Sequence, residues 1–364
     1  MSNEKIPEIH AVDLFCGVGG LTHGLVQAGI DVKAGFDLDP LCRFPYEANN
    51  DAKFVECDVN YLSSEEISRY LAGGDFTLLA GCAPCQPFST YARSGRSKKR
   101  VDDWQLVRTF GRLIEEVQPD LVAMENVPQL ASHSVFQEFL RRLSGYSVEW
   151  SVVDTATLAV PQTRKRLVLL ASKLGSAGLK LPDKAGHEVT VRKAIGKLRP
   201  IRAGESDARD PLHTASGLSD VNLERIRKSE PGGTWRDWPP ELQAACHRKS
   251  TGATYPSVYG RMEWDKVGPT ITTQCFGYGN GRFGHPEQDR AISLREAAIL
   301  QTFPPKYKFV PRGGKVTFSV LGRLIGNAVP VRLGEVVGET LLSHIDSNAV
   351  ELSKGDSGIG AWAS

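Results

Sequence analysis

The pattern of apolar and polar positions divides the chain into two regions of different texture. From about residue 9 to residue 172, short apolar runs alternate with amphipathic segments, as in strands that are joined by crossover helices. The predicted strands cover residues 10–13, 32–36, 53–56, 76–80, 121–124, 147–154 and 166–171. This region is therefore predicted to form an α/β fold with a mostly parallel sheet.

The second region begins after residue 172 and is rich in Gly, Pro, Trp and Arg, with weak periodicity, which predicts a smaller, irregular domain. Helical patterning returns over residues 293–302, where Ser293 can cap the helix and Glu296 lies at the capping-box spacing. A last apolar helix is predicted over residues 331–345. The expected boundaries are a first domain over 1–183, the irregular domain over 184–289, a return to the first domain over 290–347 and a flexible tail over 348–364.

The composition excludes some classes of protein. With 41% hydrophobic and 24% charged residues, the 364-residue chain has the content of a folded globular protein rather than a disordered one. No apolar stretch reaches the ~20 residues that a membrane-spanning helix needs. Seven cysteines at irregular spacings, without a signal-peptide pattern, favour a reducing, cytoplasmic setting over a disulfide framework.

The formal charge of +2 says little about partners, but one basic run is informative. Arg93, Arg96, Lys98, Lys99 and Arg100 lie close together in a stretch rich in Ser and Gly, which predicts a loop. The run fits contacts to nucleic-acid phosphates, and taken alone it fits a solvated charged loop equally well.

A glycine-rich turn over residues 13–20 follows the first predicted strand and opens a helix. Gly17 and Gly19 would allow a ligand to approach the backbone at the helix amino terminus. The second strand ends at Asp37, where a carboxylate can accept both hydroxyls of a ribose, and the third ends at Asp58. These features predict a nucleoside-binding edge, and a tight turn with two buried capping carboxylates is the alternative interpretation.

Cys82 and Cys85 form a C-x-x-C pair after the fourth predicted strand. Zinc would require two further ligands, and a redox dithiol would require a thioredoxin-like setting; the sequence indicates neither. We therefore prefer a single catalytic thiolate at this position and expect no metal.

Two further segments place charged groups at the same edge of the predicted sheet. Glu125 follows the fifth strand, and Arg164 and Arg166 lie at the start of the last strand, where alternation would point them the same way. Individually, a strand-end Glu is often a salt-bridge partner, and an Arg pair is often a solvated face.

Taken together, these motifs resemble the DNA cytosine-5 methyltransferase family of bacterial type. The segments that match, in the family's order behind the glycine-rich turn, are Pro84-Cys85-Gln86, Glu125-Asn126-Val127, Gln162-x-Arg164-x-Arg166, the Arg295-Glu296 helix and Gly326-Asn327-Ala328-Val329-Pro330. The resemblance covers roughly residues 9–172 and 268–342. It implies a Rossmann-like, S-adenosylmethionine-dependent methyltransferase fold, with residues 184–289 as a target-recognition domain.

The resemblance also implies a mechanism. Cytosine C5 becomes nucleophilic only after addition at C6, and Cys85 thiolate would make that addition. Glu125 would hold the base near N3 and the exocyclic amine. Arg164 would orient the base and help to hold the thiolate, with Arg166 as its support.

The site residues that the resemblance carries over fall into two groups. Those expected to bind S-adenosylmethionine are Phe15, Gly17, Gly19, Asp37, Leu38, Asp58, Val59, Pro84, Leu106 and Asn327. The acid after the second strand is commonly Glu followed by a large side chain, whereas this chain has Asp37 and Leu38. Those expected to contact DNA are Gln86, Ser89, Arg93, Arg96, Lys98, Lys99 and Arg100.

The expected partner is double-stranded DNA, from which the target cytosine must be extruded into the site. The basic run follows Cys85 directly, so it is well placed to hold phosphates and close over the extruded base. Residues 270–273, a threonine-containing stretch, resemble the end of the family's recognition domain, although strand propensity also explains them. By analogy, the chain is expected to act as a bacterial, nucleoid-associated monomer, alongside a restriction endonuclease that cuts the same site.

Three other functions compete with this interpretation. A tRNA cytosine-5 methyltransferase would share the catalytic motifs, but that branch carries Cys-Phe-Thr where this chain has Cys275-Phe276-Gly277. A catalytically silent nucleic-acid-binding regulator would not need the intact Cys85, Glu125 and Arg164. A nicotinamide oxidoreductase would leave the Pro-Cys-Gln and Glu-Asn-Val segments unexplained.

Overall fold

The computed structural model describes residues 7–84, 104–249 and 254–356. The chain divides into two compact units. The first unit comprises Met1–Asp154, Lys165–Ala185 and Val331–Ser364, and the second comprises Thr155–Arg164 and Gly186–Pro330. The second unit thus includes residues 290–330, where we expected a return to the first domain. The reason lies in packing, because a helix of that segment, α8 (Leu294–Leu300), contacts α6 (Val191–Ile195) and β9 (Asp210–Thr214).

The first unit is built on a seven-stranded sheet of order β3-β2-β1-β4-β5-β7-β6. The strands are β1 (Ile9–Leu14), β2 (Asp31–Asp37), β3 (Lys53–Glu56), β4 (Phe76–Gly81), β5 (Leu121–Asn126), β6 (Ser147–Asp154) and β7 (Lys165–Ser172). The strands from β3 to β5 pair in parallel, whereas β7 pairs antiparallel with both β5 and β6. All seven predicted strands are confirmed, and so is the mostly parallel α/β fold.

The central strands are buried on both faces, which is why their sequences form continuous apolar runs. Every residue of β1 and β5 is buried. Helices α3 (Ser64–Leu71), α4 (Gln105–Val117) and α5 (Ser134–Arg142) supply Ile67, Phe110 and Phe136 to the core on one face of the sheet. A short helix, α2 (Arg43–Glu47), follows β2.

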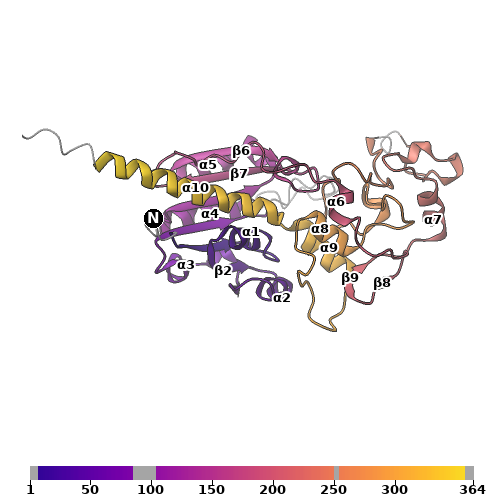
Figure 1. The fold of residues 1–364 in the computed structure, drawn as a ribbon, viewed down its shortest axis with the longest axis horizontal. Coiled ribbons are helices and arrows are strands. Elements are labelled where there is room, and N and C mark those ends of the chain that lie inside the picture. The colour runs from indigo at the N-terminus through magenta and orange to yellow at the C-terminus, as the bar shows by residue number, and fades with distance from the viewer. Residues whose placement is uncertain (1–6, 85–103, 250–253, 357–364) are drawn as a thin grey trace, which may run out of the picture. The chain divides into compact units, whose positions relative to one another are not determined.

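The helix that opens after the glycine-rich turn, α1 (Gly20–Ala28), lies against the last helix of the chain, α10 (Val331–Asp356), and Figure 1 shows the two side by side in front of the sheet. Their backbones approach closely at Gly24, where a Cβ atom would lie 2.2 Å from the carbonyl oxygen of Val331. The helix that ends the chain is therefore an integral part of the first unit.

The last helix continues to Asp356, so residues 348–356, which we predicted to belong to a flexible tail, are helical. The segment after Asn348 contains Ala, Val, Glu, Leu and Lys, and no Pro or Gly before Gly355. Adding residues to an existing helix is far easier than starting one, so helix-compatible residues extend it.

The second unit has short elements joined by long connections. Besides α6, α8 and β9, it contains β8 (Ser206–Asp207), which pairs antiparallel with β9, and helices α7 (Asp220–Arg227) and α9 (Phe318–Asn327). One of its cores gathers Ile226, Trp235, Trp238 and Tyr278. The predicted cap of α8 is confirmed, because Ser293 and Glu296 form a reciprocal capping box. In neither unit is a described helix both long and apolar enough to cross a membrane.

Candidate active site

Glu125 lies at the carboxyl edge of the central sheet and is held at both carboxylate oxygens. Only 6% of the residue is exposed. The Cys82 thiol donates a hydrogen bond to Glu125 Oε2 at 2.7 Å, and Arg166 Nε lies 2.7 Å from Glu125 Oε1. The carboxylate is thus held by a thiol on one oxygen and by a guanidinium on the other.

Strand register explains why these three residues meet. Strands β4 and β5 pair so that Gly81 lies opposite Met124, and the next residue along each strand is Cys82 or Glu125. The Cys82 backbone N–H donates to Leu14 O at 3.2 Å, which continues the ladder of β1 and β4 beyond the last paired residues. Arg166 is in β7, which runs antiparallel beside β5.

A second side chain of β5 holds the chain that leads from β4 toward Cys85. Asn126 Nδ2 donates to Ala83 O at 3.1 Å, and Asn126 Oδ1 accepts from the backbone N–H of Val127. The amide therefore ties together two loops at this edge. Of the predicted Pro-Cys-Gln motif, only Pro84, which is exposed, belongs to the described part of the chain.

The predicted nucleophile and the predicted DNA-contacting loop lie outside the described residues. This applies to Cys85, Gln86, Ser89, Arg93, Arg96, Lys98, Lys99 and Arg100.

The glycine-rich turn and the end of β2 are joined through Asp37. Its Oδ2 accepts from the backbone N–H of Gly17 at 2.9 Å, and its Oδ1 accepts from the backbone N–H of Asp39 at 2.9 Å. Burial is the largest influence on the pKa of Asp37 and raises it. Gly17 has a φ of +52°, and a Cβ built on it would meet no atom within 4 Å. The turn thus leaves space beside the Asp37 carboxylate, which backbone N–H groups hold in place.

The other predicted cofactor residues of the first unit lie on the loops that follow its strands or at the start of α4. Asp58 caps a short 3-10 helix, with Oδ1 accepting from Asn60 N at 2.9 Å, and Val59 beside it is buried. Leu38 is 66% exposed, which leaves an apolar side chain uncovered beside Asp37. Leu106 is partly buried against the core. Asn327 is exposed and belongs to the second unit.

Asp13, in the glycine-rich segment, is a buried acid to which sequence reasoning assigned no role. It is 1% exposed, and burial raises its pKa to about 7 despite a hydrogen bond from Thr22 Oγ1 to Oδ2 at 2.7 Å. Among the described residues, its Oδ1 has no hydrogen-bond partner. An acid inside an apolar strand run is the sequence signal that could have marked it.

The predicted arginine pair has two different environments. Arg166 contacts Glu125, as described above. Arg164 is 5% exposed and belongs to the second unit, where Nη1 donates to Ile271 O at 2.9 Å and Nη2 donates to Gly326 O at 3.4 Å. The guanidinium that holds the Glu125 carboxylate is thus that of Arg166, which we had expected only to support Arg164.

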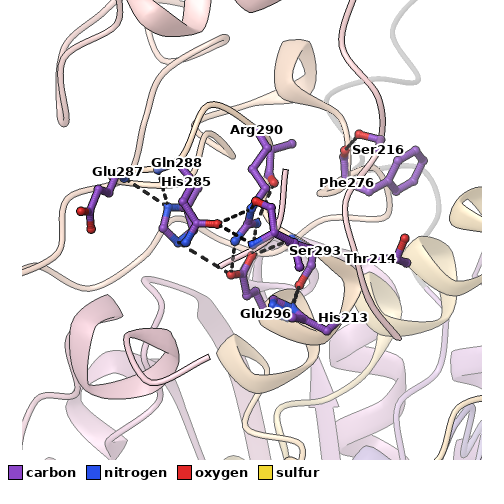
Figure 2. Close-up of polar contacts among 12 residues, drawn as sticks. His213, Thr214, Ser216, Phe276, His285, Glu287, Gln288, Arg290, Ser293 and Glu296 are labelled. Atoms are coloured by element: carbon purple, nitrogen blue, oxygen red, sulfur yellow. Dashed lines mark hydrogen bonds and ion pairs between the residues drawn. The ribbon is translucent and has the colours of Figure 1, made fainter. Parts of the chain in front are cut away.

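A second buried glutamate, Glu296, lies in the second unit (Figure 2). Its two oxygens accept from Arg290 Nη1 and Nη2, both at 2.7 Å, and Oε2 also accepts from Ser293 N at 2.7 Å. The His285 ring is near, with Nε2 3.7 Å from Glu296 Oε1, and His213 Nδ1 lies 2.9 Å from Ser293 Oγ. The cluster joins β9, the loop before α8 and the start of α8.

The cluster's ionisation states follow from burial and charge. Burial alone would raise the pKa of Glu296, but the hydrogen bonds and charge of Arg290 outweigh it and lower that pKa to about 2. Burial lowers the pKa of His285 to about 4. Its Nδ1 accepts from the backbone N–H groups of Glu287 and Gln288, so the proton of the neutral ring is on Nε2.

The fold and the residues at the carboxyl edge of the sheet agree with the resemblance to the DNA cytosine-5 methyltransferase family. The model of the C-5 cytosine-specific DNA methylase family matches residues 9–343, so the chain belongs to that family and is a DNA cytosine-5 methyltransferase.

Among its relatives, the chain is 51% identical over 341 residues to the Type II methylase M.HgiDII of Herpetosiphon aurantiacus, covering 92% of this chain and 95% of the relative. It is 30% identical over 340 residues to the Type II methyltransferase M1.HphI of Haemophilus parahaemolyticus, covering 91% and 86%. A solved structure, the Dnmt2 methyltransferase of S. pombe, has a TM-score of 0.60 at 17% identity and covers 93% of this chain and 98% of that one. At that identity, the likeness concerns the fold alone.

Proposed function

We propose that the chain methylates C5 of a cytosine that is extruded from duplex DNA, with S-adenosylmethionine as methyl donor and Cys85 as the covalent nucleophile. The observation that carries the proposal is the Glu125 carboxylate, buried at the ligand edge of the sheet and held on one side by Arg166. The family match supports the methyl donor, and Type II relatives support a role beside a restriction endonuclease. We expect the enzyme to act as a monomer.

The residues at the edge of the sheet fit the methyl donor. The open space at Gly17 would let the ligand approach the backbone. The Asp37 carboxylate would accept the ribose hydroxyls, and the exposed Leu38 would pack against the adenine ring. Asp58, Val59, Phe15, Gly19, Pro84, Leu106 and Asn327 complete the proposed set. When bound, S-adenosylmethionine supplies an electrophilic methyl group on its sulfonium sulfur.

The protein's own residues then carry the base chemistry. Cys85 thiolate adds to C6, which places the ring's electrons at N3 and C5. Glu125 bonds to N3 and the exocyclic amine and shares the proton that neutralises N3 in the adduct. Arg166 keeps the Glu125 carboxylate in place, and Arg164 with its buried guanidinium orients the base. After methylation, loss of the C5 proton and departure of Cys85 restore the aromatic ring.

Phosphate contacts are proposed for the basic run. Arg93, Arg96, Lys98, Lys99 and Arg100 follow Cys85 in sequence, and with Gln86 and Ser89 they would hold the duplex while the base is extruded. Each phosphate contact releases bound counterions, so binding by this run weakens as salt rises. The second unit is the proposed recognition domain.

The test is transfer of labelled methyl from S-adenosylmethionine to mixed genomic DNA and, in parallel, to total tRNA, followed by base analysis. We expect 5-methylcytosine in DNA, and no product from a Cys85→Ser variant that still binds the methyl donor. Label in tRNA alone would overturn the DNA substrate. Turnover by the Cys85→Ser variant would overturn the covalent mechanism.

A further inference from the structure

Cys82 is the one described cysteine of the C-x-x-C pair, and the mechanism above gives it no task. Its thiol is partly exposed, and it donates to Glu125 Oε2 at 2.7 Å. A thiol is ordinarily a weak donor, and a carboxylate oxygen is a strong acceptor for it.

The contact completes a two-sided hold on Glu125. Arg166 forms an ion pair with Oε1, with Nε 2.7 Å away, and the Cys82 thiol donates a hydrogen bond to Oε2. A carboxylate has about four acceptor sites, and within the described residues the Cys82 thiol is the one hydrogen-bond donor to Glu125, so sites for two further donors remain. The edge of cytosine that Glu125 is proposed to bind offers two donors, the exocyclic amine and a protonated N3. The thiol and the guanidinium thus fix the rotation of the carboxylate and leave the number of acceptor sites that the base requires.

The position of Cys82 is itself fixed by the backbone. Its N–H donates to Leu14 O at 3.2 Å, and the following residue is held by the bond from Asn126 Nδ2 to Ala83 O. Gly81, directly before it, packs closely against β1, because a Cβ on Gly81 would lie 2.9 Å from Leu14 O. The thiol therefore acts from a rigid support, whereas a flexible side chain would lose much of its positioning effect to rotation.

We propose that Cys82 is a positioning residue of the methyltransferase reaction: its thiol orients the Glu125 carboxylate toward the amine and N3 edge of the extruded cytosine. The inference rests on the proposed role of Glu125. The proposed role of Cys82, the first cysteine of the C-x-x-C pair, is to position a substrate-binding residue, and not to bind metal or form a disulfide.

The first experiment compares Cys82→Ala with Cys82→Ser in steady-state methylation of DNA. Loss of a hydrogen bond to a charged group predicts about a 10-fold fall in kcat for Cys82→Ala, with little change in the KM for DNA. Cys82→Ser keeps a donor at the same Cβ and should recover most of the loss. Cys246→Ala, which removes an exposed thiol in the second unit, is the control and should behave as wild type. Equal activity of Cys82→Ala and wild type would overturn the proposal, and so would equal losses for Ala and Ser.

A second experiment asks whether the thiol acts through Glu125. In a Glu125→Gln background, adding Cys82→Ala should cost nothing further, because the carboxylate that the thiol orients is already gone. With DNA whose target base lacks the exocyclic amine, the penalty of Cys82→Ala should shrink. Independent, additive losses in the double variant, or an undiminished penalty on the amine-free base, would overturn the inference.

The experiments distinguish a failure of the proposed role of Glu125 from a failure of the proposed role of Cys82. If Glu125→Gln retains full activity, the role of Glu125 fails and the inference fails with it. If Glu125→Gln is impaired while Cys82→Ala is normal, only the role of Cys82 fails. Thermal unfolding of each variant, expected to match wild type, checks that the losses in rate are not losses of fold.

Discussion

Two buried glutamates in this protein are paired with arginine, and they differ in how much hydrogen-bonding capacity they have left. Glu296 accepts hydrogen bonds from both terminal nitrogens of Arg290 and from the backbone N–H of Ser293. Its side chain is 1% exposed. Glu125 has an ion pair with Arg166 on one oxygen and a hydrogen bond from Cys82 on the other. Within the described residues, Glu296 thus accepts three hydrogen bonds and Glu125 accepts one, so the same pairing leaves one carboxylate nearly saturated and the other unsaturated.

The number of remaining acceptor sites distinguishes a structural glutamate from a functional one more clearly than burial does. Each residue would be called a buried, salt-bridged glutamate, and a buried pair is by itself weak evidence for either role. A 1% exposed carboxylate with about one acceptor site left cannot accept two donors from a base, so its contribution is to hold segments of chain together. A carboxylate with sites to spare at a ligand edge can bind a base.

Glu125→Gln is expected to give the largest effect. The amide keeps the shape but loses the charge and the shared proton, so kcat should fall about 1,000-fold, within the range typical of general acid–base groups. The rate of labelled methyl transfer to DNA measures it, with Glu149→Gln, an exposed glutamate of β6, as the matched control. A Glu125→Gln enzyme with near-normal kcat would place Glu125 with Glu296 on the structural side.

Glu296→Gln should lower the free energy of unfolding and leave the catalytic step unchanged. Removing one partner leaves Arg290 buried and uncompensated, which costs about 3–5 kcal/mol of unfolding free energy. Urea unfolding followed by tryptophan fluorescence measures the loss, and Glu287→Gln, an exposed neighbour, should change it by less than about 0.5 kcal/mol. Replacing both partners by Met and Leu should cost less than the single change; a larger cost would refute the saturated-pair interpretation.

Acid should weaken the Glu296 cluster in two steps. Folded His285 has a pKa lowered from 6.5 to about 4, so the unfolded chain binds a proton first and stability falls as pH drops from 6.5 toward 4. Glu296, with a pKa lowered from 4.5 to about 2, adds a further loss below pH 4.5. The first step amounts to about 3 kcal/mol. Urea unfolding of wild type and His285→Asn between pH 7 and 4.5 tests it, because a variant with the same pH slope would show that His285 is not responsible.

Arg166→Lys is expected to give the smallest effect of the four. Lysine keeps the positive charge of the ion pair but not the planar guanidinium beside Glu125, so the carboxylate is held less precisely and kcat should fall about 10-fold. Methylation rates of Arg166→Lys and Arg166→Met measure the charge and the geometry separately. If lysine restores the full rate, the guanidinium provides charge alone, and the carboxylate needs no directional hold on that side.

Sequence patterns predicted the strands well, because buried parallel strands are written as apolar runs between turn residues. The α8 cap was equally visible, since Ser293 and Glu296 satisfy each other within four residues. The contact between Cys82 and Glu125 was not visible. It joins residues 43 positions apart, and it depends on the register of two strands that no local pattern encodes.

The arginine assignment was incomplete for a related reason. Alternation along a strand places Arg164 and Arg166 on one side, but Arg164 precedes β7 and bonds to the backbone of residues 271 and 326. A side chain beyond the end of a strand contacts segments that are distant in sequence, so its partners cannot be read from the local pattern. The pairing of Arg290 with Glu296 also escaped notice, because the Arg lies before the helix and its burial is set by tertiary packing.

The close contact of α1 with α10 has a consequence for how the protein is made. A ribosome releases the seven strands and α1 early, but the helix that covers α1 at Gly24 begins only at Val331. The nascent first unit therefore waits with one helix face bare while Gly186–Pro330 of the second unit are synthesised. A chain cut short by a premature stop codon would keep that bare face, a mark by which chaperones and proteases could distinguish it from a finished enzyme.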